Sequence, residues 1–249
     1  MATDIALHMT SKGADRGIIV GTSGTGKSTL AKRLMETYRK ENPTGRLLIA
    51  DTKPRWRATR TLSGLTIAKR YRNMVEGDTI DGVLMDDISQ WVLAWDADVN
   101  PSHTVIVQPP TDDIYDEDAE VQRQVKIIGR YFQTLNPRQP SMLYIDEGMD
   151  FFGPTGNARH GNIIQRCYRA GRERGLLTLM AVQRAACITV QAMSESNVKY
   201  VFALEAESDF DILRKKGVPR SMEPVEENYL FRMIRNRKLY PKLLTLKEG

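Results

Sequence analysis

The sequence lacks the features that would direct a chain into a membrane or an oxidising compartment. No apolar run approaches the roughly 20 residues that a transmembrane helix needs, and the first residues lack the apolar stretch of a secretory signal. Cysteine is scarce, and Cys167 and Cys187 match no metal-ligand spacing. These absences favour two buried thiols over a disulfide and predict a cytoplasmic protein that does not contact a membrane.

Linkers, repeats and low-complexity segments are lacking as well. The chain has 249 residues, of which 41% are hydrophobic and 27% charged, a composition typical of a globular protein with a sizeable core. No stretch rich in proline, glycine or serine divides it. We expect one domain over residues 1–249, with residues 56–102 as a candidate insertion and residues 225–249 as a terminal hairpin.

Basic residues are missing from the middle of the chain. The segment from Glu76 to Glu120 holds 13 acidic residues and no lysine or arginine, so the remainder carries all 36 basic residues and only 18 of the 31 acidic ones. Such segregation suits a protein that turns one face toward a polyanion. The alternative is a solvated acidic surface, or an insertion with no role in the chemistry.

Short apolar runs alternate with amphipathic helical patterns. Because the runs are nearly continuous and often β-branched, they predict strands buried on both faces of a mainly parallel sheet flanked by helices, an α/β fold. The expected strands are Gly17–Val20, Leu47–Ala50, Thr104–Val107, Met142–Ile145, Leu176–Val182 and Tyr200–Leu204. The expected helices are Ser28–Lys40, Ala119–Leu135, Ile163–Arg174 and Asp209–Lys216.

Two further regions have weaker patterns. Tyr229–Arg235 and Lys238–Leu246 predict a hairpin that turns at Asn236 and Arg237. Residues 56–99 are consistent with a small strand pair and a helix around Ile88–Ala94.

A glycine-rich loop follows the first strand and precedes a helix, the context that distinguishes a phosphate-binding loop from a chance match to GxxxxGK[ST]. Its glycines allow backbone N–H groups to approach phosphates closely, and the helix N-terminus adds partial positive charge. We expect Lys27 to reach the β- and γ-phosphates of ATP and the Ser28 hydroxyl to bind Mg²⁺. The expected ATP-binding residues are Gly21, Thr22, Ser23, Gly24, Thr25, Gly26, Lys27, Ser28 and Thr29.

The strand Met142–Ile145 ends in two carboxylates, as hydrolysis of ATP requires. We expect this strand to lie beside the phosphate-loop strand, which would place Asp146 near Mg²⁺ and Glu147 as the general base for the attacking water. Asp86 and Asp87 are weaker rivals for the metal role. Gln183 follows another apolar strand and is a candidate to contact the γ-phosphate or its water, although a glutamine after a strand is by itself nearly uninformative.

Several segments, taken in order, resemble the FtsK–HerA superfamily of DNA-pumping ATPases. Besides the phosphate loop, Asp51-Thr-Lys53 resembles the family's second-strand motif, and Arg169 to Gly175 followed by Gln183-Arg184 resembles its R-x-x-G…TQR block. Met193 to Leu204, followed by Glu207-Ser-Asp-Phe-Asp, is similar to its last core strand and the next helix. Val182 replaces the usual threonine and Pro54 the usual glycine, which leaves the subfamily open.

The resemblance implies a RecA-like (ASCE) P-loop domain in a homo-oligomeric ring of six or five subunits, with ATP at the subunit interfaces and double-stranded DNA through the centre. It also implies a trans-acting arginine that stabilises the transferring phosphoryl group. Arg172 matches that position best, with Arg169 and Arg174 as alternates. A basic surface face is the alternative interpretation of these arginines.

DNA contacts are expected on two segments, residues 54–60, which interleave Trp56 with basic side chains, and residues 152–161, which contain His160. Ordinary exposed loops are the alternative interpretation. The small size favours a viral genome-packaging ATPase, in the host cytoplasm or associated with the virion and partnered by a capsid portal or vertex protein. The alternatives are a filamentous-phage-type assembly ATPase, a small-molecule kinase and a non-hydrolysing adaptor.

Overall fold

A central sheet organises the protein in the computed structural model, which describes residues 15–53, 56–61, 78–85, 104–109, 117–152 and 162–246. Within these residues the strands are β1 (Arg16–Val20), β2 (Arg46–Asp51), β3 (Trp56–Thr61), β4 (Asp78–Met85), β5 (Thr104–Val107), β6 (Ser141–Asp146), β7 (Leu176–Val182), β8 (Val198–Val201), β9 (Leu230–Arg235), β10 (Lys238–Leu239) and β11 (Leu244–Thr245). Ten of them follow the order β10-β9-β8-β1-β7-β6-β2-β5-β4-β3, and β11 pairs with β9. All pairings from β8 to β3 are parallel, so the expected mainly parallel sheet is confirmed.

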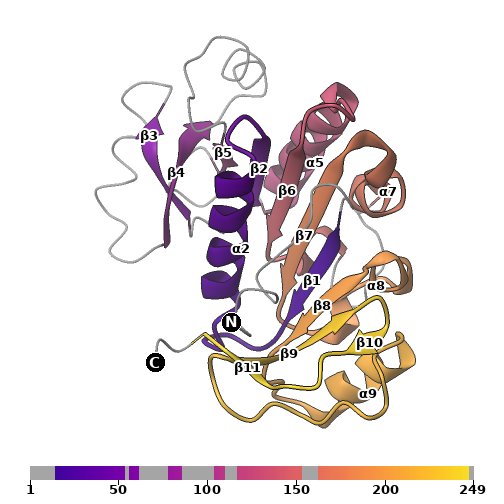
Figure 1. The fold of residues 1–249 in the computed structure, drawn as a ribbon. Helices are drawn as coiled ribbons and strands as arrows, with labels where there is room; N and C mark the ends of the chain where they lie inside the picture. The colour runs from indigo at the N-terminus through magenta and orange to yellow at the C-terminus, as the bar shows by residue number, and fades with distance from the viewer. Residues whose placement is uncertain are drawn as a thin grey trace.

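Helices cover both faces of this sheet (Figure 1). They are α2 (Lys27–Glu41), α5 (Glu117–Thr134), α6 (Met149–Phe152), α7 (Asn162–Ala170), α8 (Val190–Glu195) and α9 (Glu207–Lys215), with short 3₁₀ turns η1 (Arg172–Arg174) and η2 (Ala185–Cys187). The strands supply side chains alternately to two cores, because successive side chains of a strand point to opposite faces. Ile18 and Val20 belong to the core shared with α5, α7, α8 and α9, whereas Ile19 belongs to the core shared with α2.

The strand order corrects one expectation. We expected β6 beside β1, but β7 lies between them and pairs with both. Parallel strands require crossover connections, so neighbours in the sheet need not be neighbours in the sequence pattern. The interposed strand brings Gln183, which follows β7, between the phosphate loop after β1 and the carboxylates at the end of β6.

Two other boundaries differ from the sequence analysis. The helix expected over Ile163–Arg174 ends at Ala170, and the chain continues as η1 before Gly175, at φ 71°, turns it into β7. The last parallel strand is Val198–Val201 rather than Tyr200–Leu204. The sequence analysis also missed the short helices α6 and α8.

The expected turn of the terminal hairpin is confirmed, but its second arm is shorter than the expected Lys238–Leu246, because β10 ends at Leu239 and β11 is a separate short strand that also pairs with β9. β9 and β10 pair antiparallel, and the turn residues Asn236 and Arg237 have φ values of 51° and 65°, the left-handed geometry that two-residue hairpin turns require. The strand pair expected within residues 56–99 is also present as β3 and β4, which extend the sheet beyond β5. The helix expected around Ile88–Ala94 lies outside the described residues. None of the helices in the described part of the chain combines the length and the apolar character that a membrane span requires.

Candidate nucleotide site

The phosphate loop is fastened to three neighbouring parts of the sheet. The N–H of Gly21 donates to the carbonyl of Val182 at 3.2 Å, and the N–H of Thr22 donates to the carbonyl of Ala203 at 3.0 Å. The carbonyl of Thr25 accepts from the N–H of Tyr229 at 2.8 Å. The ends of β7 and β8 and the start of β9 therefore hold the loop in place.

The loop encloses the amino group of Lys27. Gly26 has φ 103°, a conformation that only glycine adopts readily, and it leads directly into α2. Lys27, the first residue of α2, is 6% exposed, and its Nζ donates to the carbonyl of Thr22 at 2.6 Å. The charge that the sequence analysis assigned to phosphate binding is thus held inside the curve of the loop.

Asp146 has hydrogen-bond donors on both carboxylate oxygens. The hydroxyl of Tyr144 donates to Oδ1 at 2.9 Å, and Nε1 of Trp56 donates to Oδ2 at 3.2 Å. The Trp56 and Tyr144 rings pack edge to face, with centroids 5.6 Å apart. All three side chains are at most 2% exposed, so two rigid aromatic donors fix the orientation of this carboxylate.

The position of Trp56 contradicts part of the prediction that residues 54–60 contact DNA. The sequence analysis placed its ring on an exposed loop, but Trp56 begins strand β3 and is 0% exposed. A large aromatic ring gains more from burial in the core than from exposure on a loop. Residues 54–55 and 153–161, which hold most of the remaining expected contacts, lie outside the described residues, as do Asp86 and Asp87.

Glu147 and Gln183 contact each other directly. Nε2 of Gln183 donates to Oε1 of Glu147 at 2.7 Å, and Glu147 is 3% exposed. Glu147 has φ 51°, an uncommon value for a non-glycine residue, and such outliers concentrate at functional sites. The next residue, Gly148, is bound through its N–H to the carbonyl of Ala181 at 2.8 Å. A Cβ there would overlap the side chain of Met180, so glycine suits this close approach to β7.

The segment after β2 reaches the same edge of the sheet. The Thr52 hydroxyl donates to Oδ2 of Asp150 at 2.5 Å, and Nζ of Lys53 lies 3.8 Å from Oδ1 of Asp150. Burial raises the pKa of Asp150, and the Thr52 hydrogen bond and the Lys53 charge oppose that shift. The sequence analysis noted residues 51–53 only through family resemblance, and it missed Asp150 because an isolated aspartate after a strand carries no local signal.

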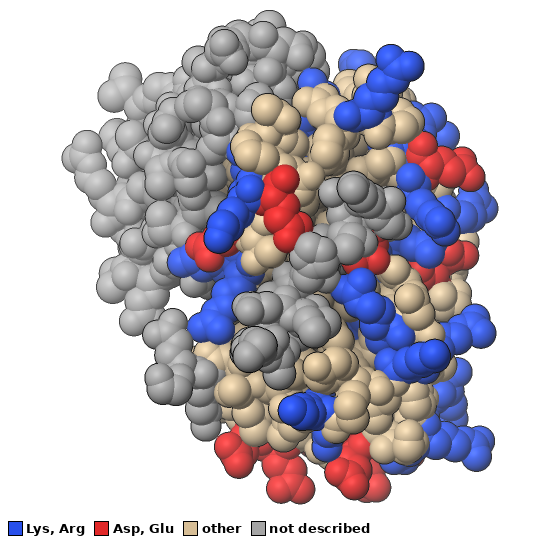
Figure 2. Space-filling view, in the orientation of Figure 1, with Lys and Arg blue, Asp and Glu red and all other residues tan. Residues whose placement is uncertain are grey.

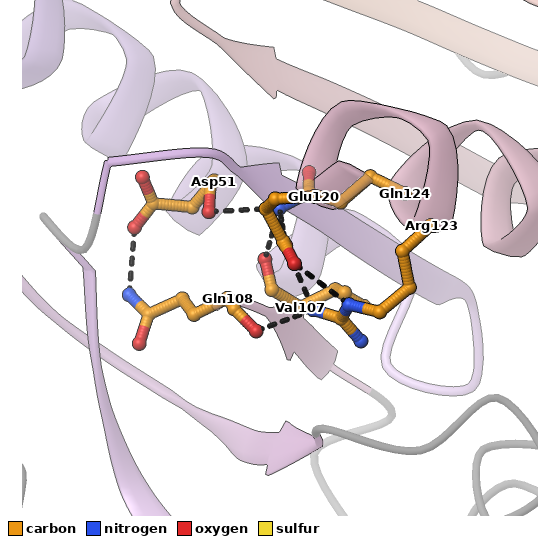
Figure 3. A network of polar contacts seen from close by, with 6 residues as sticks. All are labelled: Asp51, Val107, Gln108, Glu120, Arg123 and Gln124. Carbon is orange, nitrogen blue, oxygen red and sulfur yellow. Dashed lines mark hydrogen bonds and ion pairs between the residues drawn. The ribbon is translucent and has the colours of Figure 1, made fainter. Parts of the chain in front are cut away.

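A buried polar network around Asp51, at the end of β2, stabilises this edge (Figure 3). Oδ2 of Asp51 accepts from the N–H of Trp56 at 2.9 Å and from Nε2 of Gln108 at 2.6 Å. Nε2 of Gln124 donates to the carbonyl of Asp51 at 3.0 Å and to Glu120 at 2.8 Å, and Arg123 pairs with Glu120. This network has no signal in the sequence, since its members lie on β2, directly after β5 and on α5 and become neighbours only in the folded sheet.

The residues at this edge fit ATP with Mg²⁺. Asp51 and Asp146 are register partners on adjacent strands, and Ser28, which carries a hydroxyl, is the second residue of α2, directly after the loop. These are oxygen donors, which Mg²⁺ prefers, and few protein ligands suffice because Mg²⁺ keeps several waters. Among the described residues no cluster of three or more His, Cys, Asp or Glu side chains could hold a metal by itself.

The arginine cluster lies at the other end of β7. Arg172 precedes this seven-residue strand and Gln183 follows it, so a rise of about 3.3 Å per residue separates them by about 20 Å. Arg172 cannot reach the nucleotide site of its own chain. The guanidinium of Arg174 lies over the Phe132 ring, 4.9 Å from its centroid, whereas Arg172 and Arg169 have exposed side chains. Cys167 and Cys187 are buried free thiols, as expected.

Comparisons with known proteins extend these observations. No family model and no curated protein matches the sequence. Among solved structures, the genome-packaging NTPase B204 of Sulfolobus turreted icosahedral virus 2, in complex with AMPPCP, superposes with a TM-score of 0.61 at 15% identity, over 93% of this chain and 97% of that one. Its complex with sulfate gives 0.60 at 16% identity, over 97% and 100%. ATPases 2 and 3 of EssC from Geobacillus thermodenitrificans give 0.53 at 13% identity, over 96% of this chain and 41% of that one.

In this chain the phosphate loop, the carboxylates of Asp146 and Glu147, and Gln183 lie together at one edge of the sheet. The chain has the RecA-like P-loop NTPase fold, a mainly parallel sheet flanked by helices, that it shares with a viral genome-packaging NTPase.

Proposed function

We propose that this protein is an ATPase that moves double-stranded DNA and packages a viral genome into a capsid. One observation carries the proposal: the glutamate expected to act as the base is hydrogen-bonded to Gln183 at the sheet edge that also bears the phosphate loop. A protein that only binds nucleotide has no need of a buried, oriented glutamate there.

The chemistry follows from these side chains. The loop N–H groups and Lys27 bind the β- and γ-phosphates of ATP. Ser28 and Asp146 would hold Mg²⁺, which would supply positive charge to the phosphate oxygens. Glu147 accepts the proton of the attacking water, and Gln183 holds Glu147 in position for that transfer.

DNA as the partner is supported by fold likeness along nearly the whole chain and by charge. Figure 2 shows basic side chains gathered along the edge of the molecule where Figure 1 places α7 and α9. Exposed basic residues of this region are Arg166, Arg169, Arg172, Arg184, Arg214, Lys215 and Arg220. Arg214, Lys215 and Arg220 line a hollow of about 560 Å³ together with Asp211. Contacts of this kind bind phosphates without reading sequence.

A ring of subunits is supported by the position of Arg172. Its exposed side chain lies at the opposite end of β7 from the nucleotide edge, so any role of Arg172 in hydrolysis would be at the site of a neighbouring subunit. In a homo-oligomeric ring of six or five subunits, the arginine edge of one protomer would face the nucleotide edge of the next. Arg169, whose side chain is also exposed, is the alternate.

One assay tests the central proposal. We expect ATP hydrolysis to be stimulated by long double-stranded DNA, with the stimulation falling steeply as salt rises, because phosphate contacts release counterions. The Lys27→Ala variant, which lacks the charge on the phosphates, serves as the inactive control. If the rate of ATP turnover is unaffected by DNA at every salt concentration but rises with a small-molecule phosphoryl acceptor, the protein is a kinase and not a translocase.

A further inference from the structure

Tyr229 stands out beside the phosphate loop because its ring is exposed and its backbone is strained. The side chain is 41% exposed, although most large aromatic rings in the described residues are buried. Its φ is 65°, a left-handed value that Asn or Gly adopts at much lower cost than an aromatic residue. Within the described residues the Tyr229 hydroxyl has no hydrogen-bond partner. Neither burial of the ring nor a hydrogen bond of the hydroxyl therefore compensates for placing a tyrosine in this strained conformation.

The backbone of Tyr229 is fixed on both sides. Its N–H donates to the carbonyl of Thr25 in the phosphate loop, and its carbonyl accepts from the N–H of Leu246, each at 2.8 Å. The carbonyl of Leu246 in turn accepts from the guanidinium of Arg33 on α2 at 3.1 Å. The backbone that carries the ring is thus held in place relative to the loop and to the helix that follows it.

The ring lies directly against the end of the loop. A Cβ on Gly26 would come within 2.9 Å of Cδ1 of Tyr229, so Gly26 makes room for this ring as well as for the left-handed turn. Gly26 immediately precedes Lys27, whose Nζ marks where phosphate charge is neutralised. Any nucleotide held by the loop must project its ribose and base out of it, and Tyr229 is an exposed aromatic surface at the loop margin.

We propose that the ring of Tyr229 is the platform on which the base of the bound nucleotide stacks. This inference rests on the proposed function, namely that the loop binds a nucleoside triphosphate, and it adds the group that recognises the base. Stacking on an aromatic face tolerates every base, because each base has a π-face. The strained backbone is then the cost of presenting a rigid ring at the mouth of the loop.

The test compares a ligand with a base and a ligand without one. Binding of a non-hydrolysable ATP analogue and of inorganic tripolyphosphate, both with Mg²⁺, is measured by calorimetry on the full chain. Three variants are used: Tyr229→Asn, which suits the left-handed φ but lacks the ring, Tyr229→Phe, which keeps the ring, and Leu243→Ala. Leu243 is the matched control, since it is 42% exposed in the same C-terminal segment.

We expect Tyr229→Asn to weaken the ATP analogue by about 5- to 150-fold, the range for loss of one base–aromatic stack, and to leave tripolyphosphate affinity unchanged. Tyr229→Phe and Leu243→Ala should bind both ligands as the unmodified protein does. An equal loss of both ligands in Tyr229→Asn would make the ring a support of the loop, and no loss would remove it from the site. If the unmodified protein binds neither ligand while remaining folded, the proposed function itself fails.

Discussion

Removing the donors to Asp146 tests whether that carboxylate acts through its orientation. Tyr144→Phe deletes only the hydroxyl that donates to Oδ1 at 2.9 Å, and Trp56→Phe deletes the indole N–H that donates to Oδ2 at 3.2 Å. Each change leaves an aromatic ring in the core, so the two variants share one chemical consequence. In each variant the carboxylate keeps one of its two aromatic donors and gains rotational freedom.

The magnitude follows from the burial of these groups. A hydrogen bond to a charged group contributes about 1.5–3 kcal/mol, so Tyr144→Phe should lower the free energy of unfolding by that amount. Trp56→Phe should cost more, because the smaller ring also leaves a cavity. Loss of an outer partner of a metal-binding carboxylate typically weakens metal affinity about 10- to 100-fold. We therefore expect the Mg²⁺ concentration at half-maximal ATP hydrolysis to rise by that factor.

The control is Tyr131→Phe, which removes an equally buried hydroxyl far from the nucleotide edge. Tyr131 is 1% exposed, and its hydroxyl donates to the carbonyl of Met142 at 3.0 Å. The variant should lose stability without changing the Mg²⁺ dependence. If Tyr144→Phe shifts the Mg²⁺ dependence no more than Tyr131→Phe does, the hydrogen bonds to Asp146 serve stability alone.

Three further predictions concern single residues. Glu147→Gln should bind ATP nearly normally but lower kcat at least ~100-fold; equal losses in binding and turnover would refute its role as base. Arg172→Ala should bind ATP without hydrolysing it, and mixing it with Glu147→Gln should restore activity once subunit exchange is shown; absence of rescue would exclude action in trans. Burial, with Arg237 and Arg16, lowers the pKa of Lys199 to about 8. Its protonated form therefore costs stability below pH 8, and that cost declines as pH rises toward the unfolded pKa. Between pH 7 and 9, the free energy of unfolding measured in urea should rise by about 1 kcal/mol more in the unmodified protein than in Lys199→Met. The same pH dependence in both proteins would refute the lowered pKa of Lys199.

Features encoded by neighbouring residues could be predicted from the sequence. The loop from Gly21 to Ser28 can be recognised from the sequence because its glycine spacing, the preceding strand and the following helix lie in one segment. The strands Thr104–Val107 and Leu176–Val182 have the predicted bounds, since burial on both faces leaves a continuous apolar run. The hairpin turn at Asn236 and Arg237 is local in the same sense, because loop length and turn geometry fix it.

Features that depend on strand order could not be predicted. The indole of Trp56 bonds to Asp146 across 90 positions of sequence, and an aromatic residue between arginines has the same local pattern in a buried strand as in a DNA-binding loop. Gln108 and Gln124 likewise carry no signal until β5 and α5 pack beside β2. Tertiary packing, rather than propensity, decides where these side chains lie.

The interposition of β7 between β1 and β6 also explains why a glutamine is the informative residue of this site. Parallel strands end at one edge, and the strand between two others delivers its next residue between theirs. Gln183 is therefore flanked by the phosphate loop on one side and by Glu147 on the other, and its 2.7 Å contact with Glu147 is the product of that order. The other end of β7 carries Arg172 on the opposite edge. In the ring proposed above, this one strand would carry Gln183 at a chain's own nucleotide site and Arg172 at the surface offered to the next subunit, so a displacement of β7 along its axis would act on two sites at once.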